Sequence, residues 1–97
     1  MQLQDQTVLS NVATRLHISE STLMRESLRS FLEQQLRGLN AEVFILHLRY
    51  GVSSVEDMEA RYQDGTLEEA DSWRDLQRLD RLEFQRDELS KLLRTLQ

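Results

Sequence analysis

The chain has 97 residues, enough for one domain, and carries a net charge of −5 with no cysteine and no proline. Without cysteine, disulfides, a thiolate nucleophile and thiolate metal sites are excluded. The longest apolar run, residues 43–46, is far shorter than the roughly 20 residues of a membrane span. No basic residue precedes Arg15, so we expect no signal peptide. The absence of cysteine fits a reducing cytosol, and anionic lipids would repel the acidic second half, so we expect a cytoplasmic location and no membrane partner.

The first residues predict one short helix. Residues 1–4 alternate apolar and polar side chains and allow a very short N-terminal strand, and Asp5 is a candidate N-cap. A helix over 6–16 follows from the helical spacing of five apolar residues. These are Val8, Leu9, Val12, Ala13 and Leu16.

A long helix is predicted over 20–50, where Ser19 is a good N-cap and Gly51 stands at the place of a C-cap. Gly38 lies inside it at a cost of roughly 1 kcal/mol relative to alanine, and it is a candidate point of bending. Apolar side chains recur at steps of four and three residues, as in the seam of a coiled coil. They are Leu32, Leu36, Leu39, Val43, Leu46 and Tyr50.

The apolar surface of this helix predicts association of two copies. Phe44, Ile45 and Leu48 widen it beyond a two-stranded seam, and a chain of this length can hardly bury such a segment alone. We therefore expect a homodimer or higher oligomer assembled through the seam. Its predicted interface is Leu28, Leu32, Leu36, Leu39, Val43, Leu46 and Tyr50.

Two further helices are predicted in the second half. Residues 53–56 read as a capping box for a third helix that begins near 54 and ends at Gly65. Residues 66–69 read as another capping box for a fourth helix that runs toward the C-terminus. The three-residue steps between its apolar positions predict a kink or a short break near 77–84.

No pattern in the chain points to catalysis, a metal or a cofactor. The only histidines are His17, expected at a turn, and His47, expected at a helix interface. The sequence has no nucleophile elbow and no glycine-rich phosphate loop. No carboxylate lies in an apolar context that suits acid–base work. We therefore expect an all-α protein that binds macromolecules and is not an enzyme.

Residues 8–36 resemble a ribbon-helix-helix DNA-binding domain. In that family a helix ends in a short turn, and the next helix opens with Ser, an apolar pair, Arg, a small residue and Leu. Those places are filled here by Ser19, Leu23, Met24, Arg25, Ser27 and Leu28. The resemblance implies a symmetric dimer whose paired N-terminal segments enter the major groove of operator DNA.

The same resemblance implies a set of DNA contacts. Outward side chains of the ribbon would be Gln2 and Gln4, and glutamine can read adenine through two hydrogen bonds. The N-terminus of the second helix would bind a phosphate, and nearby arginines would add cationic contacts. The implied phosphate contacts are Ser19, Glu20, Ser21, Arg15, Arg25 and Arg29.

Residues 49–96 resemble the tail of small prokaryotic antitoxins, through the stretches 49–54, 59–62 and 65–69, Trp73 and a terminal amphipathic helix. The resemblance implies that this half wraps a toxin protein. The residues of 51–97 include twelve acids and seven bases, and such a charge steers association with a basic surface. The predicted partner-binding residues are Tyr62, Trp73, Leu76, Phe84, Leu89 and Leu93.

These patterns divide the chain into residues 1–50, for dimerisation and DNA binding, and residues 51–97, an acidic partner-binding tail. The favoured hypothesis is an antitoxin that neutralises a toxin and represses its own operon. The alternative is a helical structural or adaptor protein without a DNA role, assembled through the apolar seam of 32–50.

Overall fold

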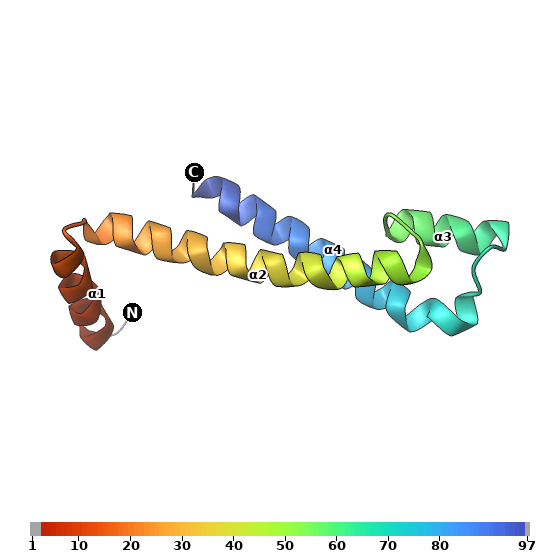
Figure 1. Ribbon diagram of the computed structural model, residues 1–97, viewed down its shortest axis with the longest axis horizontal. Coiled ribbons are helices and arrows are strands. Elements are labelled where there is room, and N and C mark those ends of the chain that lie inside the picture. The colour runs from red at the N-terminus through yellow and green to blue at the C-terminus, as the bar shows by residue number, and fades with distance from the viewer. Residues whose placement is uncertain (1–2, 97) are drawn as a thin grey trace.

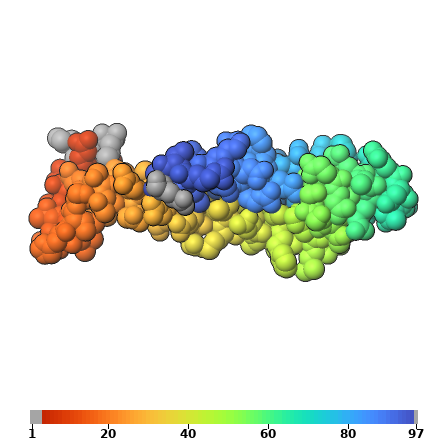
Figure 2. Space-filling model, turned by 90° about the horizontal axis from the view of Figure 1, so that it is seen from above, coloured from red at the N-terminus to blue at the C-terminus, as the bar shows by residue number. Residues whose placement is uncertain are grey.

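The computed structural model describes residues 3–96, which form four helices and no strand (Figure 1). They are α1 (Leu3–Leu16), α2 (Glu20–Tyr50), α3 (Val55–Asp64) and α4 (Glu69–Thr95). The predicted all-α class is confirmed. The molecule is a rod of 61 × 24 × 17 Å, in which α2 and α4 lie side by side along much of their length (Figure 2).

The first helix begins earlier than the sequence pattern predicted. Leu3 and Gln4 already belong to α1, and Asp5 lies in its first turn. The short strand over 1–4 is therefore wrong for residues 3 and 4, residues 1 and 2 lie outside the described part, and Asp5 is not the N-cap. An acid in the first turn instead stabilises the helix through its dipole.

The bounds of α2 match the prediction because both caps are present. The Ser19 side chain accepts a hydrogen bond from the backbone N–H of Thr22 at 3.0 Å. At the other end, Gly51 has φ of 63° and donates its N–H to the carbonyl of His47. A residue without Cβ adopts this left-handed conformation at no steric cost.

The helix caps of the second half differ in detail from the predicted ones. The N-cap of α3 is Ser54 rather than Ser53, and its hydroxyl accepts from the N–H of Asp57. Asp57 in turn accepts a hydrogen bond from the N–H of Ser53 at 2.9 Å. The capping pair is therefore Ser54 and Asp57, one residue later than the predicted pair at 53 and 56. Thr66 does not cap α4, because its hydroxyl donates to Asp64 within the turn.

The core lies between α2, α3 and α4, at the end of the rod that holds α3 (Figure 1). Its centre is formed by Leu46, Met58 and Leu79, each at most 1% exposed. Around them pack further apolar side chains of the same three helices and the loop after α2. These are Val43, Val52, Val55, Leu76 and Leu82.

The fourth helix is continuous from Glu69 to Thr95, so the kink predicted near 77–84 is wrong. The prediction rested on the three-residue spacing of apolar positions that include Trp73, but Trp73 is 46% exposed and its neighbour Ser72 is buried. Ser72 can face the core because its hydroxyl bonds the carbonyl of Glu68 and the hydroxyl of Tyr62. From Ser72 onward, inward positions recur at steps of four and three residues and need no break.

At the opposite end of the rod, α1 meets α2 at a steep angle and is weakly held (Figure 1). Ala13 is its one buried residue within the described range. The connection turns through His17, which has φ of 59°, a conformation rare for residues other than glycine. Several large apolar side chains stay exposed at this end. They are Val8, Val12, Leu16, Ile18, Leu28 and Phe31.

Candidate partner-binding surface

Two aromatic side chains of α4 stand out from the acidic half of the molecule. Trp73 is 46% exposed and Phe84 is 66% exposed. They are about three helical turns apart, so they share one face of α4 at a separation of roughly 16 Å. Exposed aromatic side chains of this size are typical anchors of protein interfaces.

Beside Phe84, a shallow groove runs between α2 and α4. Its walls are Gln35 and Leu39 on α2 and Phe84, Gln85, Glu88 and Leu89 on α4. The lining combines the apolar side chains of Leu39, Phe84 and Leu89 with amide and carboxylate groups.

The ends of α2 and α4 are joined by a cluster around Asp75. Its carboxylate accepts hydrogen bonds from the Tyr50 hydroxyl and, at 2.9 Å, from the Arg49 guanidinium. These two donors hold the pKa of Asp75 below its ordinary value, against the opposing effect of burial. Partial burial, together with the Asp75 charge, raises the pKa of Tyr50. The cluster fixes the position of α4 on α2.

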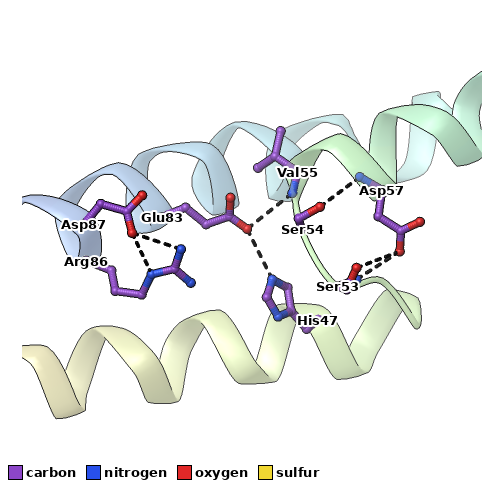
Figure 3. Close-up of polar contacts among 8 residues, drawn as sticks. All are labelled: His47, Ser53, Ser54, Val55, Asp57, Glu83, Arg86 and Asp87. Atoms are coloured by element: carbon purple, nitrogen blue, oxygen red, sulfur yellow. Dashed lines mark hydrogen bonds and ion pairs between the residues drawn. The ribbon is translucent and has the colours of Figure 1, made fainter. Parts of the chain in front are cut away.

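A second carboxylate connects three helices (Figure 3). Glu83 of α4 lies 3.3 Å from Nε2 of His47 on α2 and accepts the N–H of Val55, the first residue of α3, at 3.2 Å. Its side chain is 15% exposed. Glu83 therefore supplies an acceptor to a helix N-terminus that would otherwise keep a partly buried N–H unsatisfied.

The residues assigned to DNA contact that the structure describes lie on α1, at the turn before α2 and on α2 itself. Gln2 lies outside the described residues, and Gln4 is part of α1. Ser19 caps α2, and Glu20 and Ser21 are its first two residues. Their side chains are exposed, as are those of Arg15 on α1 and Arg25 on α2.

Arg29 is engaged elsewhere, because it donates to the carbonyl of Leu96 at 2.6 Å and lies 3.7 Å from Glu26. The assignment of Arg29 to phosphate contact is therefore corrected. This arginine satisfies a carbonyl at the end of α4.

The predicted dimer seam is covered mostly by the chain itself. Val43 and Leu46 are buried in the core, and Leu39 and Tyr50 pack against it. Leu32 and Leu36 are half-buried, and Leu28 is exposed. The interpretation of Val43 and Leu46 as dimer-interface residues is corrected. These apolar side chains are buried, but it is α4 of the same chain that buries them.

The predicted partner-binding residues divide into core and surface. Leu76 belongs to the core, and this interpretation of it is corrected. The Tyr62 hydroxyl bonds Ser72 at 2.6 Å, while Leu89 and Leu93 are half-buried. Trp73 and Phe84 remain on the surface. The sequence indicated Ile45 and Leu48 as additional apolar surface of α2, but not the second run of exposed positions at steps of three and four to which they belong.

Within residues 3–96, no group of three or more His, Asp or Glu side chains is placed to hold a metal ion. No helix of that range is long and apolar enough to cross a bilayer. The surfaces described above, with their aromatic side chains and acidic surroundings, are suited to binding a macromolecule.

Comparison with known proteins gives one match. A family model described as "Uncharacterized protein MJ0235 family" matches residues 1–97, and the chain belongs to that family. No curated protein and no solved structure matched the chain.

Proposed function

We propose that this member of the MJ0235 family is an antitoxin-like protein without enzymatic activity, which binds and neutralises a toxin protein through the outer face of α4. The observation that carries the proposal is the exposure of Trp73 and Phe84 on one face of that helix, in the acidic half of the chain. Covering two such side chains is favourable for any complementary partner.

The charge of this half favours a basic partner. Acids exceed bases by five over residues 51–97, and on the Trp73–Phe84 face Asp80 and Asp87 are exposed. An acidic surface accelerates association with a cationic one and disfavours anionic partners. Toxins that cleave nucleic acid need a cationic surface for their substrate, so they fit this requirement.

The resemblance to antitoxin tails supports the same proposal from the sequence. Of its stretches, 49–54 form the end of α2 and the connection to α3, and 65–69 form the connection to α4. Both connections position α4 against α2, so the resemblance covers the segments that present Trp73.

Operator binding is not part of this proposal. The ribbon that the resemblance assigns to DNA contact conflicts with the helical state of Leu3 and Gln4. Arg29 holds the end of α4. Without either, the cationic contacts that the resemblance implies are reduced to Arg15 and Arg25.

The experiment is a growth assay in a heterologous host. Each gene adjacent to this one is expressed alone and then together with the chain. We expect one neighbour to arrest growth, co-expression to restore it, and the two proteins to co-purify as a complex. If no neighbour is toxic, or if the chain leaves the arrest unchanged, the proposal fails.

Alanine variants test whether the Trp73–Phe84 face is the surface that binds the toxin. Trp73→Ala and Phe84→Ala should each weaken the complex at least tenfold, as expected for an interface anchor. Leu92→Ala is the matched control, because Leu92 is also on α4 and 50% exposed but lies on a different side of the helix. Equal losses in all three variants would mean that the Trp73–Phe84 face is not the binding surface.

A further inference from the structure

The outer face of α2 carries a second seam that the chain does not cover. Its positions advance by three, four, three, four and three residues, as in a coiled coil, and every one of them is exposed. We call this set the outer seam. Its residues are Phe31, Gln34, Gly38, Ala41, Ile45 and Leu48.

Gly38 is unexplained by the chain alone. A Cβ added at this position meets nothing within 4 Å, so no neighbour in the chain requires a glycine there. Yet glycine in a helix interior lowers helix stability. A shallow hollow on α2 is lined by Gly38 together with Gln34, Gln35, Leu39 and Glu42, and the exposed Ala41 follows Gly38 in the outer seam. Small residues at a crossing point let two helix backbones approach closely, so another helix gives the hollow a use.

The outer seam is symmetric about its centre. If a second α2 runs antiparallel across it, Phe31 meets Leu48 of the second copy and Gln34 meets Ile45 of the second copy. Gly38 then meets Ala41 of the second copy, and each of these pairs occurs twice. A two-fold interface must be complementary to itself in this way. Bulky residues lie at its two ends and small ones at the crossing.

Charge also favours contact between two copies at this helix. Four arginines and four glutamates make α2 neutral, while residues 51–97 carry the whole net charge of −5. Two copies repel least when their neutral helices touch and their acidic halves lie far apart. The excess of five acids lies within residues 51–79, which form α3 and the beginning of α4. In a rod 61 Å long, an antiparallel arrangement places these two acidic segments at opposite ends.

The large exposed apolar side chains supply about half of the area that each copy buries in a homodimer of ordinary size. Phe31, Ile45, Leu48 and the adjacent Phe44 are each more than half exposed and together offer on the order of 400 Å² per copy. The seam spans about 26 Å of helix, so the polar groups at its edges add to this area. A standard interface buries about 800 Å² per partner.

We propose that two copies of the chain associate through the outer seam, with their α2 helices antiparallel and crossing at Gly38 and Ala41. This surface is separate from the Trp73–Phe84 face of α4. The inference does not rest on the proposed toxin binding, and each can fail without the other.

The first test is the mass of the protein in solution. Sedimentation should show a dimer at micromolar concentration, and Ile45→Asp should raise its dissociation constant at least tenfold. Leu92→Asp, an equally exposed position on α4, should leave it unchanged. A monomer at all concentrations, or a dimer indifferent to Ile45→Asp, would overturn the inference.

A second variant separates assembly from folding. Gly38→Leu fills the hollow, so it should weaken the dimer at least tenfold while the helix content and thermal stability of the chain are kept or increased. A dimer that tolerates leucine at this position would rule out a close crossing there.

The orientation is tested by cross-linking, since the chain has no cysteine of its own. Phe31→Cys protein mixed with Leu48→Cys protein should cross-link through a short bismaleimide. Phe31→Cys protein alone should not, because its two cysteines would lie about 26 Å apart. Efficient cross-linking of Phe31→Cys protein to itself would overturn the antiparallel arrangement.

Discussion

Arg29, in the first half of α2, donates a hydrogen bond of 2.6 Å to the carbonyl of Leu96 at the end of α4. The last carbonyls of a helix have no partner within the helix, and a cation near them interacts favourably with the helix dipole. This bond therefore holds the C-terminal turn of α4 against α2, far along the rod from the core.

Replacing Arg29 should loosen that turn. We expect Arg29→Ala to lower the free energy of unfolding by about 1 kcal/mol and to increase hydrogen exchange at residues 92–96. Arg25→Ala is the control, because Arg25 is an exposed arginine on the same helix. Equal exchange in the two variants would show that the bond to Leu96 does not stabilise α4.

Replacing Glu83 should weaken the junction of three helices. Glu83→Ala removes the acceptor of the Val55 N–H and the contact with His47, so we expect a loss of about 2 kcal/mol in urea denaturation. Glu83→Gln keeps an acceptor oxygen and should lose less. Glu88→Ala, half exposed on the same helix, should change stability little. A loss as small as that of Glu88→Ala would contradict the assigned role.

The Asp75 cluster predicts a dependence of stability on acid. The pKa of Asp75 is lower in the folded state than its ordinary value of 3.8. Its contribution to stability is therefore present above pH 3.8 and is lost as the pH falls through the folded-state pKa. The difference in stability between the wild type and Asp75→Asn, followed by urea denaturation, should shrink over that range. A difference independent of pH would contradict the prediction.

The raised pKa of Tyr50 predicts that stability falls as the pH becomes alkaline. Its pKa is raised in the folded state above the ordinary value of 10.0. Its contribution is therefore present below pH 10 and is lost as the pH rises through the folded-state pKa. Tyr50→Phe should abolish that alkaline loss. Titration of tyrosinate absorbance in the folded protein checks the direction of the shift.

The turn between α1 and α2 offers a stabilising substitution. His17 has φ of 59°, and this conformation costs a residue with Cβ roughly 1 kcal/mol or more. We expect His17→Gly to slow hydrogen exchange in α1 by an amount equivalent to about 1 kcal/mol. His17→Ala keeps the Cβ and should bring no such gain. An equal response to both substitutions would mean that the side chain, not the backbone, sets the stability of the turn.

The sequence predicted where the helices begin and end better than it predicted which helices pack against one another. The bounds of α2 follow from local chemistry, because Ser19 and Gly51 end the helix by bonds to residues close in the chain. The capping serine of α3 was misplaced by one residue, since two adjacent serines offer the same hydroxyl. Periodicity showed that Val43 and Leu46 need a cover, but not that α4 of the same chain supplies it.

Of the two candidate surfaces, the sequence predicted the one on α4 but not the outer seam of α2. Trp73 and Phe84 were identified because large aromatic side chains are conspicuous in an acidic segment. The outer seam was missed as a run because Gln34 and Gly38 interrupt its apolar positions. What marks Gly38 is the open space above it, which only the fold reveals.

The loose attachment of α1, with Ala13 as its one buried anchor in the described range, bears on how long the protein survives in a cell. A segment that opens without unfolding the core exposes its backbone to proteases far more often than the rest of the chain does. We therefore expect degradation to start at this helix, at a rate set by the population of its open state.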